Sequence, residues 1–177
     1  MNLPNKLSIA RMICIPVIVV LLYFPGREYQ LAAGIVFILA SLTDFIDGRI
    51  ARSRNLVTDF GKFIDPLADK LLVLSTLVML VQCGLMDAWI PVLILCRELA
   101  VDGLRMIAVT KGKVIAASPY GKIKTTCQMI LITAILMLNQ SVYSQWYMIA
   151  LMVITVIMTV ISAVDYFRKN ASVFSDS

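Results

Sequence analysis

The sequence contains LAAGIVFILASLTDFIDGRIAR at residues 31–52 and GKFIDPLADKLLVLSTLVMLV at residues 61–81, and these two stretches decide the fold. In the first, a long apolar run ends in two aspartates, and in the second two aspartates precede a long apolar run. An ionised side chain at membrane depth is costly and usually marks a functional site. Four carboxylates in two helix-compatible pairs therefore predict a shared positive partner, of which a divalent metal is the simplest.

The composition indicates an integral membrane protein. The chain has 177 residues, of which 60% are hydrophobic, and its mean hydropathy is +0.88, whereas about half of the residues in a soluble domain are apolar. We expect one compact helical domain at residues 1–170 and a polar tail at residues 171–177. The net charge of +5 predicts contact with anionic lipid head groups. Nucleic acid is disfavoured, because the basic residues are scattered among apolar runs.

Six apolar stretches predict six transmembrane helices, since a span needs about 20 residues. The stretches are residues 7–24, 31–51, 60–81, 88–109, 123–138 and 147–167. Arg11 interrupts the first stretch, so we expect a retained span there rather than a cleaved signal peptide. The expected fold is all-α, a polytopic bundle of six transmembrane helices.

The polar residues fall at the start of the first, third and fifth spans and at the end of the second, fourth and sixth. Antiparallel neighbours with this alternation place every polar half on one side, which predicts a polar cavity there. The connections on that side are rich in Lys and Arg. The connections on the other side, at residues 25–29, 84–87 and 139–145, contain a single basic residue, Arg27. By the positive-inside rule, the cavity and both termini should be cytoplasmic, in a multi-pass protein of the cell membrane.

The carboxylate pairs have the spacing of a metal site. Asp44 and Asp47 are three residues apart, and Asp65 and Asp69 are four apart, so each pair lies on one helix face. The chain has no histidine, and ligands that offer only oxygen favour hard cations such as Mg²⁺ or Mn²⁺. Two such ions can stabilise both the attacking and leaving oxygens of a phosphoryl group. Acid–base chemistry must then use a carboxylate, a lysine or a tyrosine.

Small residues accompany the aspartates. Gly48, Ala51 and Gly61 leave room for a ligand to approach the backbone, and Arg52 suits bidentate phosphate contact. The role of Pro66 stays open, because it could begin the third span or kink it. The four cysteines show no C-x-x-C spacing, and we expect buried free thiols.

The pattern D-x2-D-G-x2-A-R-x8-G-x3-D-x3-D runs without departure from Asp44 to Asp69. It resembles the signature of the CDP-alcohol phosphotransferase family. The resemblance implies that an acceptor hydroxyl attacks a CDP-linked lipid and that CMP leaves. It also implies that Asp69 is the general base and that two metal ions are held. The implied metal ligands are Asp44, Asp47, Asp65 and Asp69, and the implied CDP-binding residues are Asp47, Gly48, Ala51, Arg52 and Gly61.

Three further stretches resemble the family members that use CDP-diacylglycerol and glycerol 3-phosphate. They are residues 3–11, with Ser8 where threonine is usual, Arg97-Glu98 with Arg105, and residues 121–125 with Gln128. The resemblance implies phosphatidylglycerophosphate as the product and a homodimer as the assembly. Basic residues should contact the acceptor phosphate, in the order Arg105, Lys124, Arg11, Lys122 and Arg97. Asp102 receives no role, and Gly34, Ala40 and Ser41 offer small surfaces for helix contact.

Several alternatives stay open. Arg97 and Glu98 could be internal charge partners without a ligand, because buried charges are usually paired, and Lys122 and Lys124 could contact lipid head groups. A sister enzyme could use inositol phosphate or phosphatidylglycerol as acceptor. A divalent-cation transporter would explain the aspartates, but it would leave Gly48 and the other small residues unexplained, and it predicts polar residues in both membrane halves.

Overall fold

The structure is a computed structural model that describes residues 3–53, 59–112, 115–116 and 118–171. Of residues 3–6, 44–53 and 59–63, only the backbone is described. The predicted polar tail therefore lies almost entirely outside the described residues.

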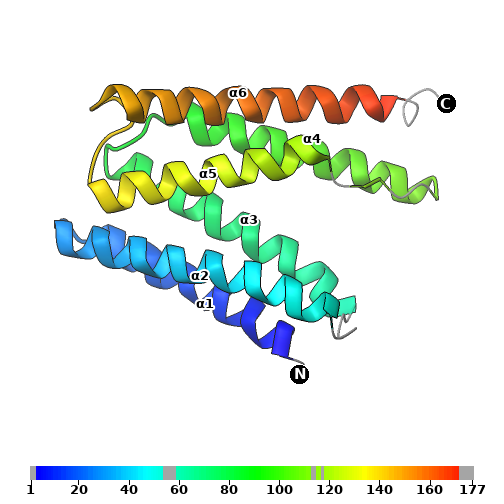
Figure 1. Ribbon diagram of the computed structural model, residues 1–177, viewed down its shortest axis with the longest axis horizontal. Helices are drawn as coiled ribbons and strands as arrows, with labels where there is room; N and C mark the ends of the chain where they lie inside the picture. Colours follow the sequence, from blue (N-terminus) through cyan, green and yellow to red (C-terminus); the bar gives the residue numbers. More distant parts are fainter. Residues whose placement is uncertain (1–2, 54–58, 113–114, 117, 172–177) are drawn as a thin grey trace. The chain divides into compact units, whose positions relative to one another are not determined.

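Six α-helices, and no strand, make up the described part of the chain (Figure 1). They are α1 (Leu3–Tyr23), α2 (Arg27–Ser53), α3 (Asp59–Gln82), α4 (Trp89–Thr110), α5 (Pro119–Leu138) and α6 (Trp146–Lys169). Each coincides with one predicted stretch, so the all-α prediction with six helices is confirmed.

Local signals explain where several helices start and stop. Helix α5 begins at Pro119, which suits the first helical position because proline has no N–H to leave unbonded. Helix α3 ends in a Schellman motif, in which Gly84 has φ of 70° and the Leu85 N–H donates to the Leu80 carbonyl at 3.0 Å. Pro66 lies inside α3, so it does not begin the third helix.

The chain divides into two compact units. Unit 1 comprises Met1–Met86 and Ile132–Ser141, and unit 2 comprises Asp87–Leu131 and Val142–Ser177. Helix α5 therefore contributes its first part to unit 2 and its last part to unit 1. A single domain over residues 1–170 stays a prediction.

In unit 1, α1 packs against both α2 and α3. Ile18, Phe37, Leu72 and Leu77 are fully buried in its core. The last part of α5 packs closely against α2, where a Cβ added to Gly34 would lie 3.1 Å from the Leu136 Cβ.

This packing corrects one expectation about small residues. Gly34 and Ala40 are buried within unit 1, and the Ser41 hydroxyl donates to the Phe37 carbonyl of its own helix at 2.8 Å. Leu136 and Met137 of the same chain approach Gly34, and Ala40 is only 4% exposed, so neither residue offers a surface to a second copy.

In unit 2, α4 packs against α6. Val101, Leu104 and Ala108 of α4 form a buried cluster with Tyr166 of α6. The cluster fixes the two helices at the end where α4 and α6 carry their charged residues.

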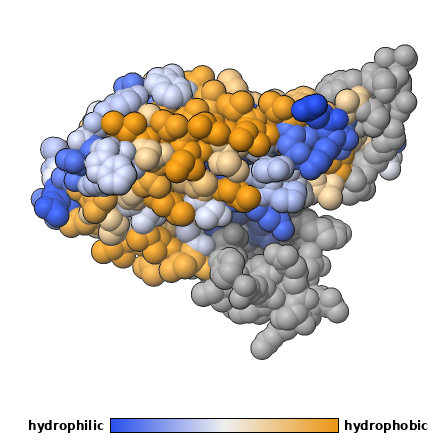
Figure 2. Space-filling view, turned by 45° about the horizontal axis from the view of Figure 1, so that its top comes forward, coloured by the Kyte–Doolittle hydropathy of each residue, from blue (hydrophilic) through white to orange (hydrophobic). Residues whose placement is uncertain are grey.

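Among the described residues, two helices, α5 and α6, are long and apolar enough to cross a membrane. Figure 2 shows large apolar areas on one face, beside smaller hydrophilic ones. Exposed apolar side chains include Ile13 and Val20 on α1 and Ile154 and Ile157 on α6. Helices α2, α3 and α4 each contain several charged residues, which lowers their hydropathy. The six-span bundle with a polar cavity therefore stays a prediction.

The cysteines are all free, as predicted, but the expectation that they are buried is wrong, since none of them is fully buried. Cys83 and Cys96 are exposed, while Cys14 and Cys127 are half-buried. An apolar segment predicts burial only in a soluble protein, because in a membrane helix the same segment can face lipid.

Candidate active site

Helix α3 presents Asp65 and Asp69 one turn apart, and α1 holds both carboxylates. The Ser8 hydroxyl donates to Asp65 Oδ1, and Arg11 Nη1 donates to Asp69 Oδ1 at 2.6 Å. Ser8 and Arg11 are three residues apart, so one face of α1 matches the pair on α3. The Arg11 side chain is only 1% exposed, whereas the Asp69 side chain is 32% exposed. The buried guanidinium thus orients a carboxylate that remains accessible.

The remaining residues of the aspartate motif lie on α2 and at the start of α3. The backbone of Asp44, Asp47, Gly48, Ala51, Arg52 and Gly61 is helical. Their side chains are outside the described residues, so their predicted roles stay predictions. The helical backbone does give Asp44 and Asp47 the spacing of one helix face.

The described acidic residues suit a hard cation in their chemistry. Asp65 and Asp69 supply only oxygen, which Mg²⁺ and Mn²⁺ prefer. Among the residues whose side chains are described, no group of three or more potential ligands occurs. The side chains of the other predicted pair, Asp44 and Asp47, lie outside the described residues, so Asp65 and Asp69 are half of the expected donor set.

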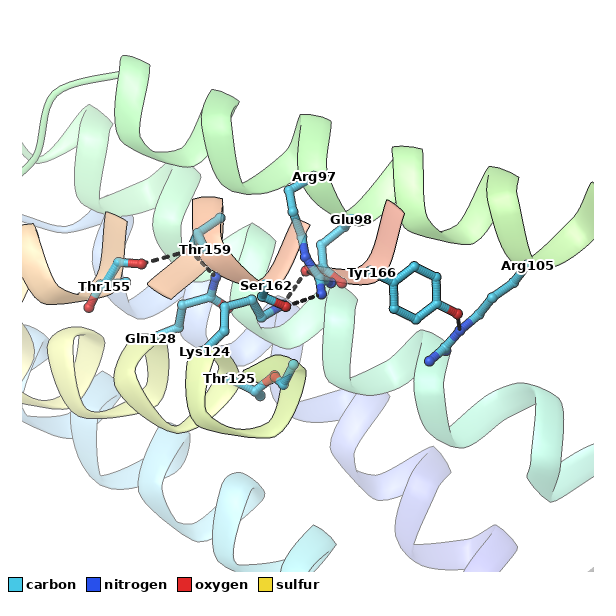
Figure 3. Close-up of polar contacts among 11 residues, drawn as sticks. Arg97, Glu98, Arg105, Lys124, Thr125, Gln128, Thr155, Thr159, Ser162 and Tyr166 are labelled. Carbon is cyan, nitrogen blue, oxygen red and sulfur yellow. Dashed lines mark hydrogen bonds and ion pairs between the residues drawn. The ribbon is translucent and has the colours of Figure 1, made fainter. Parts of the chain in front are cut away.

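Unit 2 holds a buried ionic cluster that joins α4, α5 and α6 (Figure 3). Glu98 Oε1 accepts hydrogen bonds from Arg97 Nη1 at 3.1 Å and from Lys124 Nζ. Arg97 Nη2 donates to the Ser162 hydroxyl at 2.5 Å. Lys124 and Glu98 are 4% and 8% exposed, so this cluster brings two predicted phosphate-binding residues together around one carboxylate.

Arg105 occupies a different place on α4, eight residues from Arg97, which corresponds to about 12 Å along the helix. Its Nε donates to the Tyr166 hydroxyl at 2.7 Å, and its guanidinium carbon lies 5.5 Å from the centre of the Tyr166 ring. Figure 3 shows this pair apart from the ionic cluster. Arg105 is thus not part of the contacts around Lys124.

The structure also places the remaining residues of the predicted set. Lys122 is exposed on α5, whereas Arg11 contacts Asp69 in unit 1. Gln128 is buried, and its Nε2 lies 3.5 Å from the Thr159 hydroxyl as a donor. Asp102 is half-buried on α4.

Sequence reasoning missed the polar face of α6. Thr155, Thr159, Ser162 and Tyr166 are all buried, and they contact α5 or α4. Their spacing of four, three and four residues places them on one helix face. Four hydroxyl groups at that spacing in an otherwise apolar span were a signal that could have found them.

Comparison with known proteins gives one consistent result. The sequence profile of the family described as CDP-alcohol phosphatidyltransferase matches residues 1–161. A Bacillus subtilis protein named CDP-diacylglycerol–glycerol-3-phosphate 3-phosphatidyltransferase is 45% identical, over 96% of this chain and 95% of its own length.

Two further relatives agree. A Rickettsia typhi protein with the same name is 38% identical, over 98% of this chain and 99% of its own. A Mycobacterium tuberculosis protein named probable phosphatidylglycerophosphate synthase is 38% identical, over 95% of this chain and 81% of its own. The matches therefore cover the aspartate motif and nearly all of the basic residues of unit 2.

Proposed function

The chain belongs to the CDP-alcohol phosphatidyltransferase family, and on that premise we propose that it transfers a phosphatidyl group from CDP-diacylglycerol to glycerol 3-phosphate. The products are CMP and phosphatidylglycerophosphate, so the protein acts in phospholipid biosynthesis. The observation that carries the proposal is the near-full-length similarity to proteins named for this reaction, at 45% and 38% identity. The complete aspartate motif agrees with it.

The reaction requires a base at the acceptor hydroxyl, and we assign that role to Asp69. Its carboxylate takes the hydroxyl proton, and the freed oxygen forms a bond to the phosphorus remote from cytidine. The bond from that phosphorus to the bridging oxygen then breaks, and CMP leaves with the electron pair. Arg11, at 2.6 Å from Asp69 Oδ1, orients the carboxylate, which remains 32% exposed.

The four motif aspartates, Asp44, Asp47, Asp65 and Asp69, would hold two divalent ions, Mg²⁺ or Mn²⁺. When bound, these ions would neutralise the diphosphate and stabilise the charge that develops on the leaving CMP. Ser8 supports this arrangement through its hydrogen bond to Asp65, which fixes one carboxylate oxygen and leaves the other for a ligand. Hydrogen-bond partners of this kind usually orient metal ligands and tune their basicity.

The CDP group would bind where α2 and α3 carry small residues. Gly48, Ala51 and Gly61 would let the nucleotide approach the helices, and Arg52 and Asp47 would also contact the CDP group. The acceptor phosphate needs cations, which we assign to the basic residues of the polar half. Arg105 ranks first among them, because Arg97 and Lys124 already contact Glu98.

We place the six helices across the cell membrane, with both termini and the active site on the cytoplasmic side. The charge distribution of the connections supports this orientation. The exposed apolar side chains on α1, α4 and α6 would face lipid. A homodimer is part of the proposal through family resemblance.

An acceptor assay tests the proposed reaction. Purified protein receives CDP-diacylglycerol with glycerol 3-phosphate, inositol phosphate, phosphatidylglycerol or serine, and CMP release is followed over time. We expect glycerol 3-phosphate to stimulate release well above each of the others. Stimulation by another acceptor would assign the chain to a sister reaction, and no release with any acceptor would contradict the proposed activity.

A further inference from the structure

In the part of the chain that the structure describes, the guanidinium group of Arg105 makes a hydrogen bond through only one of its three nitrogen atoms. Its Nε donates to the Tyr166 hydroxyl at 2.7 Å. Among the described residues, no hydrogen bond or ion pair involves its Nη1 or Nη2. These two nitrogens form the end of the guanidinium that binds phosphate or carboxylate in a bidentate manner.

The other basic residues of unit 2 differ in this respect. Arg97 uses Nη1 for Glu98 and Nη2 for Ser162, and Lys124 is paired with Glu98. An incoming phosphate would have to displace these contacts, whereas at Arg105 it would meet two donors that have no partner in the described part of the chain.

Tyr166 is well suited to fix the direction of Arg105. It is only 2% exposed and belongs to the buried cluster with Val101, Leu104 and Ala108. Because the packed ring of Tyr166 cannot move freely, its hydroxyl holds a fixed position at which it accepts the hydrogen bond from Arg105 Nε. The ring also lies 5.5 Å from the guanidinium carbon, within the range of a cation–π contact.

We propose that Tyr166 is a positioning residue, which acts through Arg105 to aim the two Nη groups at the phosphate of the acceptor. The inference rests on the proposed function, since it takes glycerol 3-phosphate as the acceptor. It extends that function to α6, a helix that carries none of the residues predicted to contact substrate, and to a residue that touches no substrate itself. A pre-oriented guanidinium binds phosphate with less loss of side-chain freedom than a mobile one.

The test replaces Tyr166 by phenylalanine, which keeps the ring, its packing and its cation–π contact but removes the hydroxyl. In Y166F we expect the KM for glycerol 3-phosphate to rise by about three- to tenfold, which corresponds to the loss of one ordinary hydrogen bond. The KM for CDP-diacylglycerol and the melting temperature should stay near the wild-type values. Tyr120→Phe is the matched control, because it removes a hydroxyl from an exposed tyrosine of α5 and should change neither KM.

A second pair of variants separates positioning from general support of the fold. If Tyr166 acts through Arg105, the double variant R105A Y166F should have the same glycerol 3-phosphate KM as R105A alone. Arg105→Lys keeps the charge but loses the bidentate group, and it should also raise that KM selectively. This variant keeps the proposal testable if Y166F lowers stability.

The outcomes are distinct. If the wild-type protein releases no CMP with glycerol 3-phosphate, the proposed function fails and the ligand assigned to Arg105 fails with it. If the wild type is active but Y166F or R105K keeps the wild-type KM, only the positioning role is overturned. Additive effects of R105A and Y166F, or equal rises in both substrate KM values, would also overturn it.

Discussion

Asp69 has two roles in the proposed reaction, as a metal ligand and as the base. The buried guanidinium of Arg11 contacts one of its oxygens at 2.6 Å, and the carboxylate itself is 32% exposed. A base must reach substrate while holding a fixed direction. The contact with Arg11 of α1 orients the carboxylate, and its partial exposure allows substrate to contact it.

Replacing Asp69 by asparagine should abolish turnover. Asparagine keeps the size of the side chain and can still accept the hydrogen bond from Arg11, but it cannot take the acceptor proton. We expect kcat to fall by at least about 100-fold, the usual minimum contribution of a general base, while binding of the CDP lipid stays measurable. CMP release and equilibrium binding of a radiolabelled CDP-diacylglycerol would be measured side by side.

Asp87→Asn is the control for that experiment. Asp87 is exposed and accepts a hydrogen bond from Tyr143 at 2.8 Å, so its amide variant removes one negative charge outside the candidate site. Wild-type turnover in the Asp69 variant would contradict the assignment of the base.

Glu98 compensates two cations in unit 2, and its loss should destabilise the protein. Glu98→Ala leaves Arg97 and Lys124 buried without the carboxylate, and removing one partner of a buried pair costs about 3–5 kcal/mol. Thermal unfolding in detergent would report a lower Tm for this variant. Adding Lys124→Met should recover part of the loss, because it removes one of the two buried cations that Glu98 pairs with. An unchanged Tm in Glu98→Ala would mean that the cluster contributes nothing to stability.

The aspartates could be predicted from the sequence because their arrangement is local. Residues three or four apart on a helix share a face whatever the helix packs against. The spacing alone therefore predicts that Asp65 and Asp69 lie on one face of α3. The contacts of Arg105 with Tyr166 and of Arg97 with Ser162 join helices that are distant in the sequence. They depend on how α6 is rotated against α4, which no local pattern specifies.

At the scale of helices, predicted and observed bounds differ by only a few residues, because the length of an apolar run limits the length of a span. The largest differences occur where polar residues continue a helix beyond its apolar part. Helix α1 starts at Leu3 rather than at residue 7, and α5 starts at Pro119 rather than at residue 123. Apolar content locates the segment inside a membrane, while the backbone continues to form hydrogen bonds past its edge.

The close approach of α2 to the end of α5 predicts a strict size limit at Gly34. An alanine Cβ would lie 2.7 Å from the Met137 Cε, a flexible end, and 3.1 Å from the Leu136 Cβ. Gly34→Ala should therefore be tolerated with a small loss, whereas Gly34→Leu should lower the stability by about 1–3 kcal/mol, as overpacked cores do. Thermal unfolding of both variants measures this.

Gly103 of α4 provides the comparison. A Cβ there meets no described atom within 4 Å, so Gly103→Ala should raise the stability by up to about 1 kcal/mol through helix propensity alone. Equal effects of alanine at Gly34 and Gly103 would show that helix propensity, not packing against α5, decides both.

For the whole molecule, removal of metal should stop the reaction without unfolding the helices. The six helices depend on backbone hydrogen bonds and apolar packing, so circular dichroism in a chelator should match that of the untreated protein. CMP release should vanish in the chelator and return with Mg²⁺ or Mn²⁺. Activity that persists in a chelator would contradict the two-metal assignment.

The proposed orientation can be tested with the native Cys83, which follows α3 directly. It lies next to residues 84–87, a predicted outer connection, and is exposed. In a variant whose other three cysteines are replaced by serine, a membrane-impermeant thiol reagent should label Cys83 in intact cells. In that background with Cys83 also replaced by serine, Lys111→Cys, which follows α4 on the predicted cytoplasmic side, should be labelled only after permeabilisation. The reverse pattern would invert the topology.

The pH dependence of the same reaction tests the environment of the Cys83 thiol. Although Cys83 as a whole residue is exposed, partial burial of its thiol raises the thiol pKa, and the thiolate is the reactive form. Below the pKa the thiolate fraction grows tenfold with each pH unit, so labelling should be slower near neutral pH than for an ordinary thiol. The rate should also keep rising to a higher pH before it levels off. Cysteine at the exposed position Lys111 in permeabilised cells is the reference, and identical pH profiles at both positions would contradict a partly buried thiol at Cys83.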